Sequence, residues 1–336
     1  MQSVLHPIIG PAGPEVKDLK GRTALITGGA NGIGKEVARA FAKYGAKVIM
    51  INRKEEQGSA AIEQFNKEAQ EQGIQGGQLD VHWVGCDIAK MSDVRKVFSE
   101  IAEKEDRLDL LVLSAGINSE QFGLSADNLD RHFALNALGH FYIVNLFYPL
   151  LRKTSKLPNT PPPRIVFESS EQHRFAPPNV HYGSLAEIND DTIDPNRLYG
   201  RTKLALILYT KGLLEYVIKK NNDNIYVLAV HPGTVNTNMQ EQWKKAYPGL
   251  FGQTVSFLMQ TFGRDIEQGS YSALYAALAD EVLEKGWNGY YFSDPAQPGK
   301  ETAQANDKWL IRSCWELSER LIREKAGEDA LKPWDA

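Results

Sequence analysis

The chain has 336 residues, 42% of them hydrophobic and 24% charged, with a net charge of −4. This composition indicates a folded chain, because disordered chains contain fewer apolar residues and carry a larger net charge. The acidic balance and the lack of a basic cluster argue against nucleic acid as a partner, and the distant Cys86 and Cys314 suggest neither a disulfide framework nor a metal site.

Residues 1–20 contain no apolar run long enough for a signal peptide and are expected to form an extended arm. No stretch of the chain reaches the roughly 18 apolar residues that a membrane-spanning helix needs. We therefore expect no membrane span and a cytoplasmic location.

Short β-branched apolar runs then alternate with longer segments of helical periodicity, which predicts repeated βαβ units. Apolar runs without strict alternation are typical of strands buried on both faces. The expected fold is α/β, a single-domain doubly wound Rossmann fold with a mostly parallel sheet. The expected strands are 23–27, 47–51, 81–86, 109–113, 164–168 and 225–230, and the expected helices include 33–44, 55–71, 94–105 and 129–151.

A glycine-rich turn links the first expected strand to the first helix, with the spacing G-x3-G-x-G. Close approach of the backbone to a pyrophosphate requires residues without a Cβ. The helix that follows directs free N–H groups and the positive end of its dipole at the phosphates. We predict a dinucleotide site here, and a glycine turn without a ligand is the alternative. The predicted residues are Gly28, Asn31, Gly32, Ile33 and Gly34.

The second strand ends at Asn52 and Arg53, where a carboxylate would bind the ribose 2′-hydroxyl and repel a 2′-phosphate. Arg53 instead offers a planar cation that suits a phosphate, and Lys35 or Lys54 is available to assist it. This predicts NADP(H) as the cofactor rather than NAD(H). A solvated arginine at a strand end is the alternative interpretation.

Small and polar residues follow the third and fourth strands. Asp87, with Ile88 after it, is placed to accept a hydrogen bond from the adenine amino group or to cap the next helix. Ala115 and Gly116, after Ser114, let the chain pass close beside the cofactor or make a simple tight turn. Both pairs are therefore candidate cofactor-binding residues.

Tyr199 and Lys203 are four positions apart and share one face if their segment is helical. A nearby ammonium stabilises a phenolate and lowers its pKa, so Tyr199 is predicted to exchange a proton with a carbonyl or alcohol oxygen. Ser170, in the Ser169–Ser170 pair that ends a strand, is expected to polarise that oxygen. Asn136 lies inside an expected helix, where a water-mediated link to Lys203 or simple satisfaction by the backbone would explain it.

These residues resemble the short-chain dehydrogenase/reductase family over roughly 23–240. The motifs, in family order, are TGGANGIG at 27–34, SAG at 114–116, Asn136, SS at 169–170, YGRTK at 199–203 and PGTVNT at 232–237. The resemblance implies a seven-stranded Rossmann sheet and a catalytic tetrad of Asn136, Ser170, Tyr199 and Lys203. It also implies that Tyr199 and Lys203 contact the cofactor, and that Pro232, Gly233, Val235 and Thr237 lie at the nicotinamide.

Two features place the chain near the retinol-dehydrogenase-like branch and its fungal relatives. Ser170 and Tyr199 are 29 positions apart, a long gap shared by that branch, and His173 follows the serines. Family members often pair through the helices that carry Asn136 and Tyr199, which is compatible with a homodimer. The retinol enzymes often carry a membrane anchor, which this chain is not expected to have.

The Rossmann domain is expected at 21–295, with a segment covering the substrate at about 238–264, and a C-terminal helix and tail at 296–336. The loop at 153–163 and the stretch at 171–198 are insertions. Within 307–325 the apolar residues share one helical face. We expect this helix to pack on the domain, and a helix that binds a partner or a membrane surface is the alternative.

The aromatic residues of 238–264, together with Phe175, His181 and Tyr182, indicate an apolar pocket for a hydrophobic or aromatic ketone, aldehyde or alcohol. The sequence thus predicts an NADP(H)-dependent oxidoreductase acting on a small molecule. Two alternatives are a non-catalytic NADP-binding sensor or scaffold, and an epimerase or dehydratase that keeps its cofactor. The intact tetrad argues against the first, and the glycine spacing and short tail argue against the second.

Overall fold

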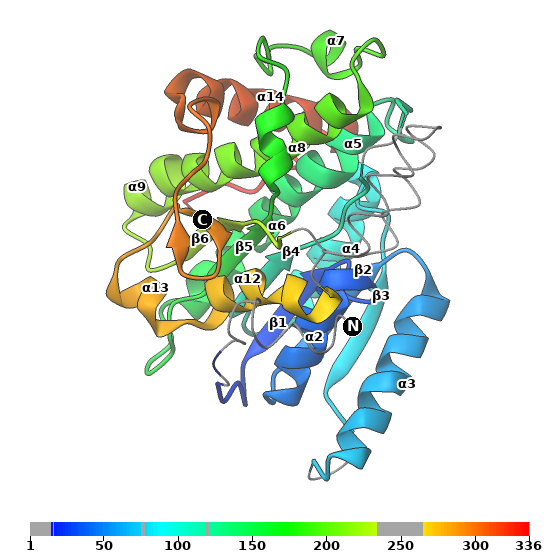
Figure 1. Ribbon diagram of the computed structural model, residues 1–336, viewed down its shortest axis with the longest axis vertical. Coiled ribbons are helices and arrows are strands. Elements are labelled where there is room, and N and C mark those ends of the chain that lie inside the picture. The colour runs from blue at the N-terminus through cyan, green and yellow to red at the C-terminus, as the bar shows by residue number, and fades with distance from the viewer. Residues whose placement is uncertain (1–14, 16, 75–77, 119–120, 234–264, 336) are drawn as a thin grey trace.

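A twisted sheet with helices on both faces forms the centre of the computed structural model, which describes residues 15, 17–74, 78–118, 121–233 and 265–335 (Figure 1). The strands run in the order β3-β2-β1-β4-β5-β6-β7-β8. All neighbours up to β7 are parallel, and β8 is antiparallel to β7. The strands are β1 Thr23–Thr27, β2 Lys47–Asn52, β3 Val81–Gly85, β4 Leu110–Leu113, β5 Arg164–Glu168, β6 Tyr226–Val230, β7 Tyr291–Asp294 and β8 Gln297–Pro298.

This sheet confirms the predicted α/β doubly wound fold. Every residue of β1, β4 and β5 is buried, as the unbroken apolar runs indicated. The seven parallel strands match the family expectation, and β8 adds an eighth. The sequence did not reveal β7 or β8, because half of β7 is polar and β8 has only two residues, so neither produces a clear apolar run.

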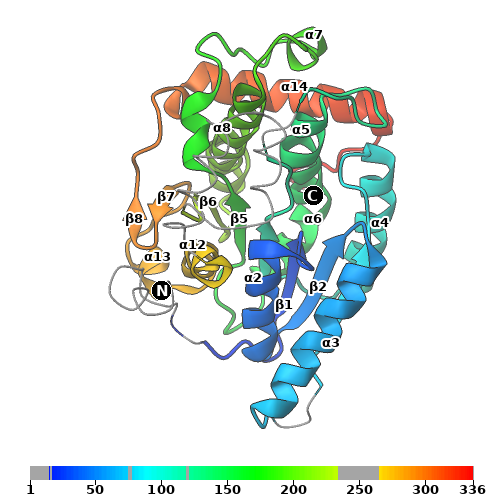
Figure 2. The same ribbon diagram turned by 45° about the vertical axis from the view of Figure 1, so that its right-hand side comes forward.

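Two hydrophobic cores lie on opposite faces of the sheet (Figure 2). One core is formed with α4, α6, α8 and α14, and the other with α2, α3 and α12. The long helices are α2 Gly32–Lys43, α3 Glu55–Glu71, α4 Met91–Lys104, α6 Gly139–Thr154, α8 Pro195–Leu213, α12 Ile266–Leu278 and α14 Lys308–Ala326. The short ones are α5 Arg131–Phe133, η1 Ala134–Leu138, η2 Glu171–Phe175, α7 Leu185–Ile188, η3 Leu214–Ile218, α9 Lys219–Asn221, α13 Asp280–Glu284 and η4 Gln304–Asn306.

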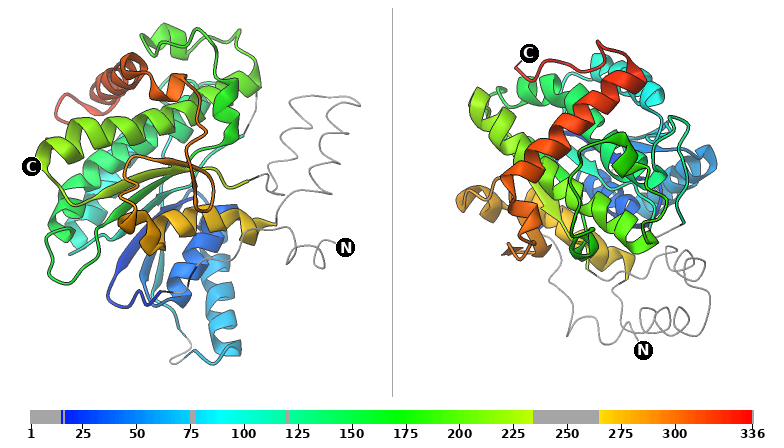
Figure 3. Two further views of the ribbon diagram at one scale, coloured as in Figure 1. Left: turned by 60° about the vertical axis from the view of Figure 1, so that its left-hand side comes forward. Right: turned by 90° about the horizontal axis from the view of Figure 1, so that it is seen from above.

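The C-terminal helix α14 lies across the outer side of α8 (Figure 3). Asp307 caps its first turn by accepting hydrogen bonds from the backbone N–H groups of Trp309 and Leu310. Its apolar face, Leu310, Cys314, Leu317 and Leu321, is buried. The helix therefore packs on the sheet-bearing body, while the domain boundaries drawn from the sequence stay a prediction.

The tail after α14 continues over α6. The Tyr142 hydroxyl donates to the carbonyl of Ala330 at 3.1 Å, and Asn145 Nδ2 donates to the carbonyl of Lys332 at 2.9 Å. The Trp334 ring lies 5.1 Å from that of Trp315 and 5.8 Å from that of Phe141. Together α14 and the tail cover the side of α6 and α8 that faces away from the sheet.

One helical stretch, Arg131–Thr154, is long and apolar enough to cross a membrane, with a mean hydropathy of 1.2 over its best window. That window is 94% buried inside the molecule. Its apolar residues contact β-strands, α4, α8 and the tail rather than an outer surface. The stretch is therefore buried in the way expected of a helix in the hydrophobic core.

Candidate active site

The turn between β1 and α2 holds its shape because glycines fill two crowded positions. A Cβ on Gly34 would lie 2.6 Å from the carbonyl oxygen of Gly28, and a Cβ on Gly28 would lie 3.0 Å from the Cα of Ala115. Gly32 has a positive φ of 54° and nothing within 4 Å of its Cβ position. The turn is thus closed against β4 on one side and open on the other, which suits a phosphate group.

The first turn of α2 lies at this open side. Asn31 caps it, since its side-chain oxygen accepts a hydrogen bond from the N–H of Gly32 at 2.9 Å. No acidic residue occupies the first turn, so the helix dipole is left positive for an anion. The predicted residues Gly28, Gly32, Ile33 and Gly34 therefore form a cradle that fits the pyrophosphate of a dinucleotide.

Arg53 and Asp87 follow the neighbouring strands β2 and β3. Arg53 Nη1 lies 4.0 Å from Asp87 Oδ2, and the Arg53 side chain is 61% exposed. Asp87 Oδ1 also accepts a hydrogen bond from the N–H of Ala89 at 3.1 Å, so the side chain stabilises its own turn. Ile88 is buried, and Lys35 donates to Gln64. Arg53 is thus held at the sheet edge with most of its guanidinium in solvent.

The helix α8 carries Tyr199 and Lys203 on one face. Lys203 Nζ lies 5.4 Å from the centre of the Tyr199 ring and donates a hydrogen bond to the backbone carbonyl of Glu168 at 2.6 Å. In turn, Ser169 Oγ donates to the backbone carbonyl of Lys203 at 2.8 Å. These two bonds fix α8 against the carboxyl end of β5.

Ser170 meets Tyr199 because η2 packs tightly on α8. A Cβ on Gly200 would lie 2.7 Å from the carbonyl oxygen of Gln172, so only glycine permits this approach. Ser170 caps η2 by accepting a hydrogen bond from the N–H of Gln172 at 3.1 Å, and its side chain also hydrogen-bonds that of Tyr199. The structure therefore brings the two predicted hydroxyl groups together.

Asn136 lies in η1, a single π-helical turn between α5 and α6. Its side chain accepts from the N–H of Ile117 at 2.9 Å, donates to the carbonyl of Ile117 at 2.9 Å, and donates to Thr202 Oγ1 at 3.2 Å. The backbone of Ile117 thus satisfies this side chain, and the predicted water link to Lys203 stays a prediction. A Cβ on Gly116 would lie 3.2 Å from Asn136 Oδ1 and 4.0 Å from Lys203 Nζ, so all three are neighbours.

Comparison with known proteins gives a consistent result. The short chain dehydrogenase family model matches residues 22–183. The oxidoreductase bli-4 of Neurospora crassa, named as mitochondrial, is 33% identical over 93% of this chain and 74% of that protein. The chain belongs to the short-chain dehydrogenase/reductase family. Human retinol dehydrogenase 14 is 29% identical over 92% of this chain and 91% of that protein, in agreement with the predicted retinol-dehydrogenase-like branch.

Solved structures of the family share the fold. An uncharacterised Mycobacterium paratuberculosis protein superposes with a TM-score of 0.67 and 24% identity, covering 94% of this chain and 98% of that one. A short chain dehydrogenase of Shigella flexneri complexed with NADP has a TM-score of 0.58 and 20% identity, covering 83% of this chain and 99% of that one. At these identities the likeness shows the Rossmann architecture.

The electrostatics differ from the expectation that Lys203 lowers the pKa of Tyr199. Burial raises that pKa, the charge of Glu168 raises it further, and only the hydrogen bond from Ser170 opposes them. Burial also lowers the pKa of Lys203 to about 8, against the charge of Glu168. The physical reason is position, because the ammonium sits over the ring and donates to a backbone carbonyl rather than to the phenol oxygen.

Sequence reasoning missed two buried titratable residues in this short-chain dehydrogenase/reductase. His140 Nε2 lies 3.0 Å from Thr27 Oγ1, and its Nδ1 lies 3.0 Å from the carbonyl oxygen of Asn136; burial and the charge of Lys203 lower its pKa to about 3. Glu168 is only 7% exposed. The signals were a histidine four positions after Asn136, and a carboxylate that ends a strand directly after the apolar residues Ile165, Val166 and Phe167.

The structure describes only the start of the segment after β6, which is predicted to contact the nicotinamide. Pro232 and Gly233 follow β6, and the N–H of His231 donates to the carbonyl of Phe292 at 2.8 Å. Val235, Thr237 and the segment expected to cover the substrate, 238–264, lie outside the described residues. Their predicted roles stay predictions.

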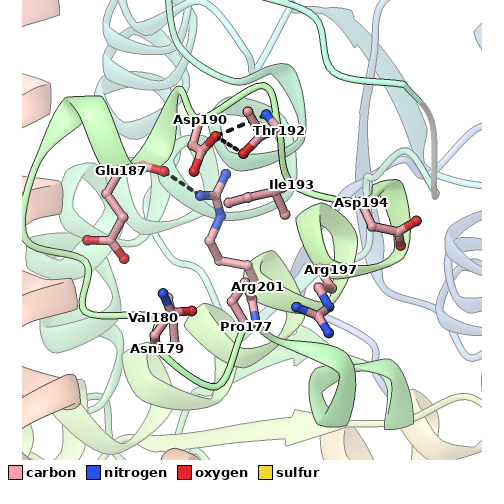
Figure 4. Close-up of a pocket in the computed structure, with 10 residues that line it drawn as sticks. All are labelled: Pro177, Asn179, Val180, Glu187, Asp190, Thr192, Ile193, Asp194, Arg197 and Arg201. Carbon is pink, nitrogen blue, oxygen red and sulfur yellow. Dashed lines mark hydrogen bonds between the residues drawn. The ribbon is translucent and has the colours of Figure 1, made fainter.

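A cavity of about 500 Å³ lies beside the insertion at 171–198 (Figure 4). Arg201 stands at its centre and donates to the carbonyl of Glu187 at 2.8 Å. Arg197 and Arg201 lie two positions before Tyr199 and Lys203, respectively, so they point from the opposite side of α8. The lining residues, many of them charged, are Pro177, Asn179, Val180, Glu187, Asp190, Thr192, Ile193, Asp194, Arg197 and Arg201.

The apolar pocket expected between the insertion and 238–264 is a different feature from this charged cavity. Phe175 is 59% exposed, and the His181 ring lies 5.6 Å from that of Trp309. Tyr182 is buried and donates to the carbonyl of Arg201 at 2.8 Å. Tyr182 thus braces α8, whereas the wall expected from Phe175 and His181 stays a prediction, because the facing segment 238–264 lies outside the described residues.

Proposed function

We propose that this chain is an NADP(H)-dependent oxidoreductase that interconverts a carbonyl and an alcohol on a hydrophobic or aromatic small molecule. The observation that carries the proposal is the cluster of Ser170, Tyr199 and Lys203 at the carboxyl end of β5, beside Gly116 and the glycine turn. Ligands of open α/β sheets bind at this edge. The short-chain dehydrogenase/reductase family supports oxidoreduction of carbonyls and alcohols in general.

When bound, the nicotinamide supplies or accepts the hydride at the carbonyl carbon. The Tyr199 hydroxyl gives its proton to the carbonyl oxygen in reduction and takes it back in oxidation. Ser170 donates a hydrogen bond to the same oxygen and holds it beside the phenol. Lys203, buried and bonded to the Glu168 carbonyl, places a positive charge under this site.

NADP(H) is proposed over NAD(H) because Arg53, and no carboxylate, follows β2. The Shigella flexneri relative complexed with NADP supports a nicotinamide cofactor without deciding between the two. Asp87 is proposed for the adenine, and Ala115, Gly116, Val235 and Thr237 for the nicotinamide half. A retinoid is one candidate substrate, on the strength of the name of retinol dehydrogenase 14.

A homodimer through α6 and α8 would have to displace α14 and the tail, which cover these helices. We therefore expect a monomer, and a mass from light scattering tests this. A cytoplasmic location stays a proposal, since the relative bli-4 is named as mitochondrial.

The decisive experiment follows nicotinamide absorbance with a panel of ketones, aldehydes and alcohols, using NADPH and NADH in parallel. Tyr199→Phe should remove turnover. The matched control is Tyr209→Phe, also a buried tyrosine of α8 but bonded to Ser318 Oγ at 2.7 Å away from the site. Binding of NADPH without turnover of any substrate would favour the sensor or scaffold function instead.

A further inference from the structure

A carboxylate is buried beneath the proton-transfer site, and nothing in the proposed tetrad accounts for it. Glu168 ends β5 directly before the two serines and is 7% exposed. Its Oε2 atom is buried, and no hydrogen-bond partner for it is found within the described residues. Burial of a charge without full pairing is costly, so such a group calls for a functional explanation.

The side chain of Glu168 stands between the cofactor turn and the catalytic helix. Ser114, at the end of β4, hydrogen-bonds its carboxylate. The Ser114 hydroxyl lies 3.2 Å from the Cβ position of Gly34, at the start of α2. On the other side, the backbone carbonyl of Glu168 accepts the hydrogen bond from Lys203 Nζ. Glu168 therefore contacts both halves of the site.

Among the residues that the structure describes, few charged groups surround Glu168. The charge of Lys203 on α8 lowers the pKa of Glu168, and the charge of Glu168 raises the pKa of Tyr199 on the same helix. His140 on α6 faces Lys203 and is neutral above about pH 3. The buried residues of α2 and α12, which pack on the same face of the sheet, are uncharged. Beyond Ser170, Glu171 is paired with Arg174, and its N–H donates to His231 Nδ1 at 3.3 Å.

We propose that Glu168 is a positioning residue of the proton-transfer site, whose buried carboxylate keeps the ammonium of Lys203 charged beside Tyr199. This proposal rests on the proposed function only where turnover is measured. A carboxylate favours the charged form of a nearby ammonium and opposes ionisation of a nearby phenol. In this site the charge of Glu168 raises the pKa of Lys203 against burial and raises that of Tyr199.

The first test uses the full chain without substrate. The protein is labelled with 13C at the carboxyl carbon of its glutamate side chains and observed by NMR. The signal of Glu168 is the one that disappears in both Glu168→Gln and Glu168→Asp. Burial raises the pKa of Glu168 to about 6, so the midpoint of its titration should be higher than the midpoints of exposed glutamates. In Lys203→Met this midpoint should rise by roughly one pH unit or more, because the ammonium lowers it.

Lys211→Met is the matched control for that measurement. Lys211 is also on α8, but it pairs with Glu301 at 2.9 Å, so its loss should leave the Glu168 midpoint unchanged. A Glu168 midpoint that matches exposed glutamates, or one that does not respond to Lys203→Met, would overturn the proposal. If Glu168→Gln does not fold, Glu168→Asp still assigns the signal.

The second test is the pH profile of carbonyl reduction. Burial lowers the pKa of Lys203 to about 8, so the rate should fall as the ammonium loses its charge at higher pH. Glu168→Gln should move this fall to lower pH by roughly one unit, while Glu168→Asp should keep it near the wild-type position. A merely structural role would lower kcat without moving the profile, which would count against the proposal. If the wild type turns over no carbonyl, the proposed function fails, and the glutamate titration still decides the role of Glu168.

Discussion

The helices on the two faces of the sheet differ in how far the rest of the chain covers them. In α3 the buried residues are Gly58, Ala61, Phe65 and Ala69, which form one stripe. In α8 every residue from Leu198 to Thr210 is buried, because the sheet lies on one side and α14 on the other. We call the face covered by α2, α3 and α12 the cofactor face, and the face covered by α4, α6, α8 and α14 the catalytic face. Helix α3 on the cofactor face is thus exposed on one side, whereas α8 on the catalytic face is enclosed.

This difference separates two ways of building a site. The phosphate cradle depends on the backbone of one turn and the start of one helix, which are adjacent in sequence. The proton-transfer site depends on Asn136, Ser170 and Tyr199, which come from three elements and meet only through tertiary packing. Substitutions should therefore affect binding and turnover separately.

The largest effects are expected from two variants, Tyr199→Phe at the proton-transfer site and Gly34→Ala at the phosphate cradle. Loss of a general acid typically costs roughly 10² to 10⁴ in rate, so Tyr199→Phe should remove turnover and retain NADPH binding. Gly34→Ala should instead weaken NADPH binding, since its Cβ would meet the Gly28 carbonyl at 2.6 Å and displace the turn, and it should lower turnover only through the lost cofactor. Fluorescence titration with NADPH and steady-state rates measure the two effects.

Gly73→Ala is the control for the glycine substitution. Gly73 has a positive φ of 65° and nothing within 4 Å of its Cβ position, so strain of about 1 kcal/mol is expected without loss of binding. Equal loss of NADPH affinity in Tyr199→Phe and Gly34→Ala would show that the two parts of the site are not separable.

The second prediction concerns α14, the helix that covers α8. Trp315 is buried against Phe141, with ring centres 4.8 Å apart, whereas Trp309 on the same helix is 54% exposed. Trp315→Ala should lower the free energy of unfolding by about 3–5 kcal/mol, and Trp309→Ala by much less. Urea denaturation of both variants measures this. Similar losses in the two variants would mean that α14 does not enclose the catalytic face.

The third prediction concerns Glu168, which lies between the cofactor turn and the catalytic helix α8. Burial raises the pKa of Glu168 to about 6 from an ordinary value of 4.5, so the folded chain binds the proton more tightly than the unfolded chain. The contribution of Glu168 to stability therefore falls as pH rises from about 4.5 to 6, by about 2 kcal/mol. Glu168→Gln should lack this fall. Parallel unfolding curves of the two proteins across this pH range would contradict the burial argument.

The smallest effect is expected at the edge of the cofactor face. Arg53→Ala should raise KM for NADPH about tenfold and leave KM for NADH unchanged, because the exposed guanidinium gains only part of a charge-assisted bond. Arg312→Ala, an exposed arginine of α14 paired with Glu316, should change neither value. Equal rates of the wild type with both cofactors would remove the case for NADP(H).

Much of the fold could be predicted from the sequence because the central strands are apolar without interruption. The expected strands at 23–27 and 164–168 match β1 and β5 in the structure, and the helix at 55–71 matches α3. The expected helix at 129–151 contains the π-helical turn η1 instead of regular turns. That turn follows from packing around Asn136, for which no local pattern gives a signal.

The sequence by itself determined the order of strands and helices, the glycine turn and the spacing of Tyr199 and Lys203, since each rests on residues close along the chain. Tertiary structure alone decided that Lys203 bonds the Glu168 carbonyl, that Gly200 lets η2 approach Tyr199, and that α14 encloses α8. The physical reason is that burial and charge at a site are sums over neighbours from many elements. Their distances are set when those elements pack together, and no local stretch of sequence contains them.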